Sequence, residues 1–267
     1  MICILPIVVL YNVDFHETNV YHTLLSHMAG ERILIYENSP EPQNKCYESE
    51  QIIYYHDSHN GGVSAAYNYG ATVARRLEDV NAVLLLDEDT QFESDYLSVL
   101  QTACQANPHI NLFVPQVLYA EDKPFSPIHR GIHWHRGAML NEGIYNMKDY
   151  LPVKSGACIR LSAFEKVGGY NKDIRLDFAD FDFFSRMSAL YDTFYRVGSI
   201  ARQSFSNEET RADILFRRYQ FYIEGARIAR RNPLIRKMVN IEVMRHTLAL
   251  TVRTRRFMFI NYLIQNY

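Results

Sequence analysis

The sequence predicts one α/β domain with a mostly parallel central sheet flanked by helices, followed by a helical C-terminal extension. Its 267 residues, 48% of them hydrophobic, are enough for one sizeable core and few for two full domains. Short apolar runs alternate with longer amphipathic segments, which is the pattern of βαβ units around a parallel sheet. The final 60 or so residues read instead as basic amphipathic helices interrupted at Pro233.

Five short runs rich in Ile, Val, Leu or Tyr predict the strands of this sheet. They cover residues 4–10, 32–36, 51–55, 82–86 and 111–114. Segments between them repeat apolar residues at spacings of three and four, which predicts helices over residues 17–28, 62–76 and 94–106.

Between residues 125 and 152 the alternation of apolar runs and amphipathic segments is absent. Pro, Gly, His and aromatic residues there predict a long functional loop. Trp134 lies in this loop between two histidines and is a candidate for stacking on a sugar, although an aromatic loop folding over its own core is an equal alternative. A glycine-punctuated apolar block, residues 155–170, leads into the acidic stretch LDFADFDFFSR, residues 176–186.

The four cysteines lie far apart without a CxxC pair, which fits neither a disulfide framework nor a structural zinc site. A reducing compartment, and so a cytoplasmic protein, is expected. The apolar stretch 2–11 has no basic leader or cleavage site and is too short to span a bilayer, so we interpret it as the first buried strand.

Charge is unevenly distributed along the chain. Residues 211–267 contain 12 Lys and Arg against three Asp and Glu, although the whole chain has a net charge of −2. Such a tail suggests an anionic partner, either membrane lipid or nucleic acid. A solvated basic face and a protein-binding helix pair are the alternatives.

The first chemical motif is LLLDEDT, in which an apolar strand runs directly into Asp87, Glu88 and Asp89. Side chains alternate along a strand, so Asp87 and Asp89 can face one point. Two hard oxygen ligands suit Mg²⁺ or Mn²⁺ held jointly with a nucleotide diphosphate. The alternative is that the three acidic residues cap a helix or lie in a solvated turn.

The second motif is HNGGVSAAYNYG, residues 59–70, at the start of a predicted helix. Glycines there allow close approach of a phosphate to backbone amides, although they also suit a tight loop that only packs the helix on the sheet. The glycine spacing is not GxGxxG and no GK[ST] follows, which argues against dehydrogenases and P-loop nucleoside triphosphatases.

Taken together and in order, these motifs resemble those of family 2 glycosyltransferases of the GT-A fold, closest to bacterial rhamnosyltransferase-like members. The resemblance covers roughly residues 4–190. PIVVLYN resembles the opening strand, IYENS the acidic segment that follows the second strand, and LLLDEDT the metal-binding segment. The resemblance implies that the nucleotide sugar is bound by Tyr11, Asn12, Glu37, Asn38, Asn60, Gly62, Asn68, Asp87 and Glu88, and the metal by Asp87 and Asp89.

On the acceptor side, SGACIRLSAFEKVGGYN and LDFADFDFFSR also resemble family segments. The resemblance implies that Asp180 is the catalytic base, that Ser155 and Gly156 lie near the acceptor, and that Asp177 and Asp182 flank the base, where helix-capping or ion-pair roles are favoured. The chain lacks the histidine that many relatives carry after the acidic block. It has Glu37 where Asp is usual, so the nucleobase does not follow from that position.

The resemblance implies an inverting transfer from a nucleotide-diphosphate sugar to a hydroxyl of a glycan or lipid-linked acceptor, with a leaning towards thymidine diphosphate rhamnose. We expect two units. Residues 1–207 form the glycosyltransferase domain, divided at about residue 115 into nucleotide and acceptor halves. Residues 208–267 form a basic extension, which we expect to contact anionic membrane peripherally and not nucleic acid. The same carboxylates also suit a metal-dependent nucleotidyltransferase or phosphoester hydrolase. A catalytically silent binding protein is the third possibility, disfavoured by the joint presence of Asp87, Asp89 and Asp180.

Overall fold

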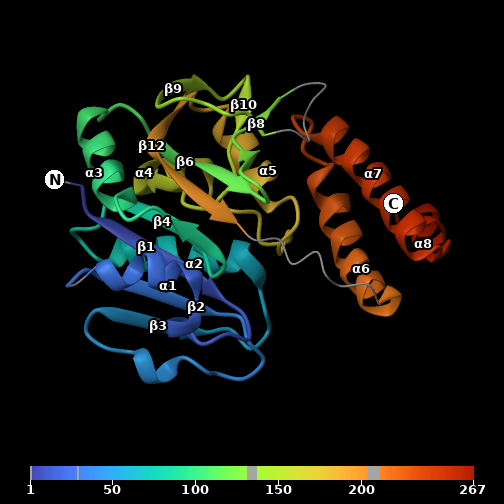
Figure 1. Ribbon diagram of the computed structural model, residues 1–267, viewed down its shortest axis with the longest axis horizontal. Coiled ribbons are helices and arrows are strands. Elements are labelled where there is room, and N and C mark those ends of the chain that lie inside the picture. Colours follow the sequence, from blue (N-terminus) through green and yellow to red (C-terminus); the bar gives the residue numbers. More distant parts are fainter. Residues whose placement is uncertain (1, 29, 131–136, 204–210) are drawn as a thin grey trace.

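In the computed structural model, which describes residues 2–28, 30–130, 137–203 and 211–267, the chain forms a ten-stranded mixed sheet between two layers of helices (Figure 1). A further two-stranded sheet lies beside it. The strands are β1 (Ile4–Leu10), β2 (Ile33–Glu37), β3 (Ile52–His56), β4 (Ala82–Asp87), β5 (Thr90–Phe92), β6 (Leu112–Tyr119), β7 (Lys123–Ser126), β8 (Ile128–His129), β9 (Gly143–Asn146), β10 (Tyr150–Leu151), β11 (Cys158–Arg160) and β12 (Thr193–Gln203).

The order of the strands across the main sheet is β3-β2-β1-β4-β11-β6-β12-β5. Strands β3, β2, β1 and β4 are parallel, β11 runs antiparallel to both of its neighbours, and β12 is again parallel to β6. The carboxyl ends of the four parallel strands therefore meet at one edge of the sheet, where open α/β sheets bind their ligands.

All five predicted strands are present, within one residue at most ends. The exception is β6, which continues to Tyr119 because Pro115 and Gln116, which hide the apolar pattern in the sequence, are buried within it. Strand β12 was not predicted. Its mixture of Arg, Gly and apolar residues, with a register shift between Arg196 and Ile200, obscures the period of two.

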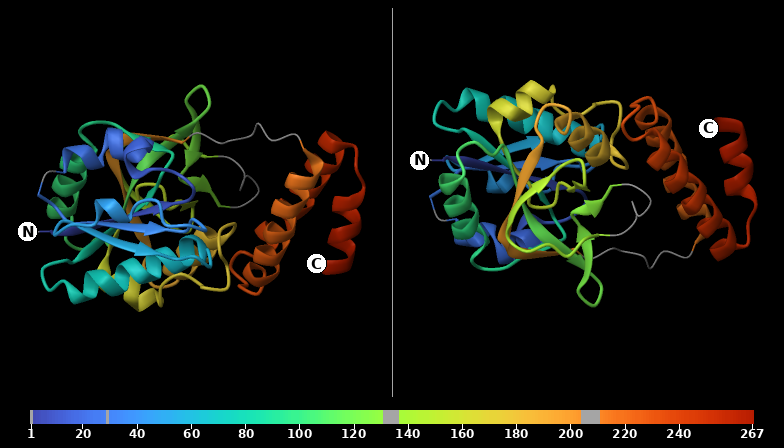
Figure 2. Two further views of the ribbon diagram at one scale, coloured as in Figure 1. Left: turned by 90° about the horizontal axis from the view of Figure 1, so that it is seen from below. Right: turned by 90° about the horizontal axis from the view of Figure 1, so that it is seen from above.

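The helices are α1 (Asn19–Thr23), α2 (Gly62–Arg76), α3 (Tyr96–Ala106), α4 (Leu161–Val167), α5 (Ala179–Met187), α6 (Ala212–Ala229), α7 (Arg236–Thr254) and α8 (Met258–Asn266), with short 3₁₀ turns at Phe15–Glu17, Leu25–His27 and Lys45–Tyr47. Side chains of β1 alternate between two cores. Ile7 and Val9 pack with α2, α4 and α5, whereas Val8 and Leu10 pack with α1 and α3. Figure 2 shows the sheet edge-on between these two helical layers.

The single helix expected over residues 17–28 is wrong. The side chain of Thr18 caps α1, but the helix lasts five residues because Leu24 has φ −130° and lies outside the helical region. Three aromatic or β-branched residues and a histidine in NVYHT also give it little intrinsic helix propensity.

The expected loop of residues 125–152 contains the short strands β8, β9 and β10 and the end of β7. Strands of two to four residues are too short to show a period of two. Trp134 lies in residues 131–136, outside the described residues.

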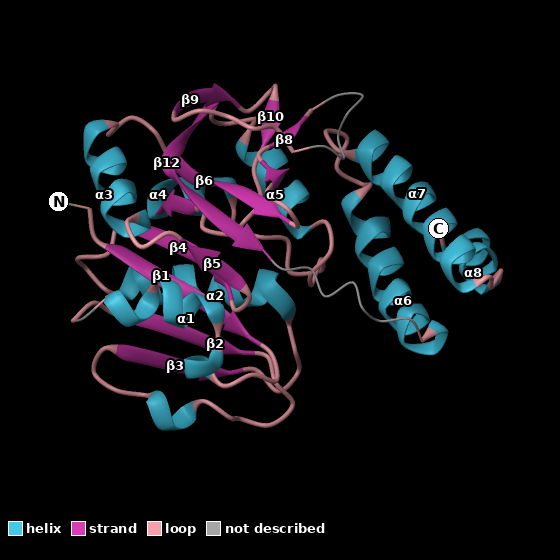
Figure 3. Ribbon diagram, in the orientation of Figure 1, coloured by secondary structure: helices cyan, strands magenta, loops and turns pink. Residues whose placement is uncertain are grey.

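The C-terminal helices stand beside the main body (Figures 1 and 3). Tyr219, Ile223 and Phe259 from these helices belong to the same hydrophobic core as Phe183 of α5. Gly225 of α6 packs against the carbonyl of Asp177, where an added Cβ would lie 3.1 Å from the oxygen. The unit boundary at residue 207 remains a prediction. Among the described residues, no helix is long and apolar enough to cross a membrane.

Candidate active site

The carboxyl ends of β1, β2 and β4 are joined by hydrogen bonds. The backbone N–H of Tyr11 donates to Oε2 of Glu88 at 2.8 Å, and the N–H of Asn12 donates to Oγ of Ser39 at 2.9 Å. Asn12 has φ +54°, so the chain turns sharply where β1 ends. The structure thus brings together three segments that the sequence motifs assign to nucleotide binding.

Asp87, the last residue of β4, is held by two consecutive residues of the acceptor half. Lys154 places Nζ 2.7 Å from Oδ1 of Asp87, and Oγ of Ser155 donates to Oδ2 at 2.8 Å. The side chains of Lys154 and Asp87 are only 14% and 13% exposed. Burial favours the neutral amine, but the charges of Asp87 and Asp180 outweigh it and raise the pKa of Lys154.

Asp180, the predicted base, lies near the same lysine in the first turn of α5. Its Oδ2 accepts the backbone N–H of Lys154 at 3.1 Å, and its Oδ1 accepts the hydroxyl of Tyr170 at 3.3 Å. Burial raises the pKa of Asp180, whereas the positive charge of Lys154 acts in the opposite direction. A carboxylate with a raised pKa is a stronger proton acceptor once it is ionised.

Asp89 and Glu88 also have perturbed pKa values. Burial, together with the charge of Asp87, raises the pKa of Asp89 to about 6. Burial raises the pKa of Glu88 to about 7, although the hydrogen bond from Tyr11 acts against it. Several carboxylates with raised pKa values at one sheet edge are characteristic of a functional site.

The glycine-rich loop before α2 is shaped by Asp57, which the sequence motifs did not single out. Its carboxylate accepts the backbone N–H groups of His59 and Gly61 and the hydroxyl of Tyr36. Asn60 and Gly62 both have positive φ values. A Cβ atom on Gly62 would lie 2.1 Å from the carbonyl oxygen of Arg175, so a glycine is required there by close packing against the acceptor half.

Asn68 is turned towards the protein itself. Its amide donates to the carbonyl of Tyr170 at 2.9 Å, and its Oδ1 accepts the N–H of Tyr170 at 2.8 Å. Because Tyr170 in turn contacts Asp180, Asn68 links α2 to the loop that holds the predicted base.

Glu37 is fully buried, and its carboxylate accepts the hydroxyl of Tyr54 and the backbone N–H groups of Gln43 and Asn44. Burial opposes its ionisation, but these hydrogen bonds outweigh burial and lower the pKa of Glu37. Glu37 therefore shapes the loop after β2. The neighbouring Asn38 is buried too, yet its Oδ1 has no hydrogen-bond partner among the described residues.

The remaining predicted acceptor-side residues have different surroundings. Gly156 has φ +78° and donates its N–H to Leu85, which fixes the turn after Ser155. Burial raises the pKa of Asp177. Asp182 forms an ion pair with Arg186 at 2.9 Å and accepts a hydrogen bond from Asn232, so it is engaged in packing α5 against the C-terminal helices.

Lys154 and Tyr170 are site residues that sequence reasoning missed. Neither lies in a local charge pattern, and their partners are distant in sequence. Asp57 could have been found from the sequence, because it directly follows β3 and precedes the glycine-rich loop.

A divalent cation fits part of this donor set. Within the described residues, no three His, Cys, Asp or Glu side chains converge on one point. Both oxygens of Asp87 have partners within the protein, whereas Asp89 forms no ion pair in the described part of the chain and accepts a side-chain hydrogen bond from Gln203. Asp89 therefore offers a hard oxygen ligand to a cation that diphosphate oxygens and water would complete.

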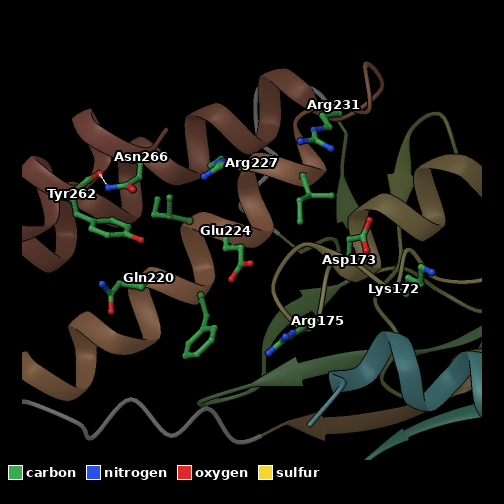
Figure 4. Close-up of a pocket in the computed structure, with 12 residues that line it drawn as sticks. Lys172, Asp173, Arg175, Gln220, Glu224, Arg227, Arg231, Tyr262 and Asn266 are labelled. Atoms are coloured by element: carbon green, nitrogen blue, oxygen red, sulfur yellow. Dashed lines mark hydrogen bonds between the residues drawn. The ribbon is translucent and has the colours of Figure 1, made fainter. Parts of the chain in front are cut away.

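A groove of about 680 Å³ lies between the loop at residues 172–175 and helices α6 and α8 (Figure 4). Four basic and two acidic side chains line it: Lys172, Arg175, Arg227, Arg231, Asp173 and Glu224. The groove adds an exposed basic surface to the acceptor half, apart from the carboxylate cluster.

The parallel strands with carboxylates at their shared edge, together with the separate acidic start of α5, form a domain of the GT-A fold. The sequence profile named Glycosyl transferase family 2 matches residues 10–168, and the chain belongs to this family. No curated protein sequence matches the chain at a significant level.

Solved structures confirm the fold. The chain is similar to GalNAc-T7, crystallised with UDP, GalNAc and Mn²⁺, with a TM-score of 0.53 and 11% identity over 78% of this chain and 45% of that one. It is also similar to S. aureus TarS 1-349 in complex with UDP, with a TM-score of 0.55 and 12% identity over 86% of this chain and 66% of that one. The chain thus spans about half to two thirds of these proteins.

Proposed function

We propose that the protein is an inverting glycosyltransferase that moves a sugar from a nucleotide-diphosphate donor to a hydroxyl of a glycan or lipid-linked acceptor, in the synthesis of a surface polysaccharide. The supporting observation is that Asp87 and Asp180 come from different elements and meet at one residue, Lys154. Displacement at an anomeric carbon needs such an arrangement, with a donor-side charge cluster and a separate base.

Asp180 removes the acceptor proton in this proposal. The hydrogen bonds from Tyr170 and from the backbone of Lys154 fix the orientation of its carboxylate. A single displacement with one base inverts the anomeric configuration, so an α-linked donor gives a β-linked product. Asp177 and Asp182 remain flanking residues.

Mg²⁺ or Mn²⁺, when bound, would supply Lewis-acid stabilisation of the departing nucleoside diphosphate. Asp89 would hold the ion directly, with Asp87 behind it. The presence of Mn²⁺ in the GalNAc-T7 structure supports this assignment.

We propose a pyrimidine nucleoside diphosphate as the donor nucleotide, with Tyr11, Asn12, Asn38, Asn60 and Gly62 lining its site. The unpartnered Oδ1 of buried Asn38 is suited to accept an N–H group from the base, since a buried polar atom without a partner is unfavourable. Both neighbours named above carry UDP. Thymidine diphosphate rhamnose shares the pyrimidine and remains the donor favoured by the sequence resemblance.

The acceptor carries a phosphate or diphosphate in this proposal. The basic groove beside residues 172–175 has four cationic side chains, and Arg175 lies two residues before Asp177. A lipid-linked diphosphate sugar matches this charge.

We further propose that α7 touches an anionic membrane at its cytoplasmic face, where the four free cysteines stay reduced. Not every aromatic residue of α6 is available for such a contact: Phe221 is exposed, whereas Tyr219 is 1% exposed and forms a hydrogen bond with Thr247. The exposed apolar stripe is instead Ile241, Met244, Leu248 and Val252, at spacings of three and four along α7. The positive tail would repel a second copy and favours anionic lipid.

A thermal-shift screen with and without Mn²⁺ tests the function first. Uridine or thymidine diphosphate sugars should raise the melting temperature more than guanosine diphosphate sugars. Product analysis then separates the reaction classes, since a glycosyltransferase releases a nucleoside diphosphate and a nucleotidyltransferase releases pyrophosphate. Absence of binding by all of these nucleotides would support the silent-protein alternative.

A further inference from the structure

Lys154 is a buried cation at the centre of the carboxylate cluster. Its ammonium group pairs with Asp87 at 2.7 Å, and the charges of Asp180 and Asp89 also act on it. Its backbone N–H binds Asp180. One residue therefore contacts both the donor-side carboxylate and the predicted base.

The ammonium group retains unused hydrogen-bonding capacity. An ammonium ion has three N–H donors, and Asp87 is the one acidic residue within 4.0 Å of Nζ in the described part of the chain. The second oxygen of Asp87 accepts the hydroxyl of Ser155 and does not contact the ammonium group. Donors of Lys154 thus remain for a ligand that enters the cluster.

The ligand that suits these donors is an anion. A cluster that holds Asp87, Asp89 and Asp180 repels a diphosphate unless positive charge compensates it. Asp89 with a divalent ion supplies part of this charge, and Lys154 is a fixed cation that is present without metal. Asn38 follows β2 and the loop at residues 59–62 follows β3, so both belong to the same edge of the parallel sheet as Asp87 at the end of β4.

We propose that Lys154 binds the donor diphosphate through its ammonium group and stabilises the charge on the departing nucleoside diphosphate. This inference rests on the proposed function. A charge-assisted hydrogen bond in a site of restricted solvent access is stronger than the same contact in water. Lysine rather than metal alone would then compensate the β-phosphate.

The test compares UDP with UMP, which lacks the β-phosphate, by calorimetric titration of the full-length protein and its variants. Lys154→Met should weaken UDP binding about tenfold or more and change UMP binding about threefold or less, because the contact is with the β-phosphate. Lys154→Arg should restore most of the loss. Lys148→Met, at an exposed lysine paired with Asp192, is the matched control and should bind UDP like the wild type.

Lys154→Met leaves Asp87 buried without its partner, so a second pair of variants tests the inference in case Lys154→Met does not fold. Asp87→Asn/Lys154→Met should bind UDP about tenfold more weakly than Asp87→Asn alone. Equal losses for UDP and UMP, or binding unchanged by removal of Lys154 in either background, overturn the inference while leaving the proposed function intact. Wild-type protein that binds neither UDP nor thymidine diphosphate overturns both.

Discussion

The Nζ atom of Lys154 lies 2.7 Å from Oδ1 of Asp87, so the first acidic residue of the DED motif is already compensated by the protein. Asp89, two residues further on, forms no such pair among the described residues. The two aspartates of one motif are thereby given different roles, which sequence spacing alone does not reveal.

Asp89→Asn should weaken Mn²⁺-dependent UDP binding about tenfold or more, because the variant replaces a hard carboxylate ligand by a neutral amide. Asp87→Asn should weaken UDP binding only modestly in the presence and in the absence of metal, because Lys154 keeps its charge but loses the ion pair that orients its ammonium group. Calorimetry with Mn²⁺ and with chelator measures both. Glu50→Gln, at an exposed residue before β3, is the control. Activity unaffected by chelation in the wild type and in both variants would contradict the metal assignment.

The stability of the free protein should fall as the pH rises through about 6 to about 7, the raised pKa values of Asp89 and Glu88. A carboxyl group whose pKa is raised in the folded state binds its proton more tightly there. Its stabilisation is therefore complete below the pKa of the unfolded chain and is lost as the pH rises through the folded pKa.

Asp89→Asn removes this ionisation, so its melting temperature at pH 8 should exceed that of the wild type by roughly a few degrees, and the gap should narrow at pH 5. Scanning calorimetry without metal or nucleotide measures it. Asp192→Asn, at an exposed residue, should show no such trend. An equal difference at both pH values would rule out Asp89 as the source.

Arg175→Gln/Arg227→Gln should raise the KM for a lipid-diphosphate-linked sugar several-fold and leave the KM for the donor unchanged. Both residues line the basic groove, and each removed cation weakens a contact with phosphate. Arg217→Gln lies on α6 but does not line the groove, and it serves as control. The same sugar on a neutral lipid should not distinguish the variants; if it does, the groove does not act on phosphate.

Leu248→Glu/Val252→Glu should reduce binding to phosphatidylglycerol vesicles by more than about tenfold, since two exposed apolar side chains leave the lipid boundary. Ile264→Glu, at an equally exposed residue of α8, should retain binding. Flotation measures the bound fraction. A dimer in solution that dissociates in the double variant would show instead that this face binds a second copy.

The parallel half of the sheet and its carboxylate edge could be predicted from the sequence because strands such as β1 and β4 are continuous apolar runs. The ion pair between Asp87 and Lys154 could not be predicted from the sequence. The two residues are 67 positions apart and are brought together by the pairing of β11 with β4. Glu37 was expected at the nucleotide, yet its carboxylate faces the loop at residues 43 and 44. Side-chain direction at a strand end depends on such tertiary hydrogen bonds, which leave no periodic signal.

The most direct test of the central claim is product analysis for the wild type and Asp180→Asn with uridine and thymidine diphosphate sugars and a lipid-linked acceptor. We expect release of the nucleoside diphosphate and an acceptor extended with inverted anomeric configuration. Asp180→Asn should bind the donor almost normally but reduce transfer by roughly 10²-fold or more, because it keeps the shape of Asp180 without its proton acceptor. Asp182→Asn should affect transfer less, since Asp182 pairs with Arg186. Release of pyrophosphate by the wild type would show that the protein is not a glycosyltransferase, and full transfer by Asp180→Asn would show that Asp180 is not the base.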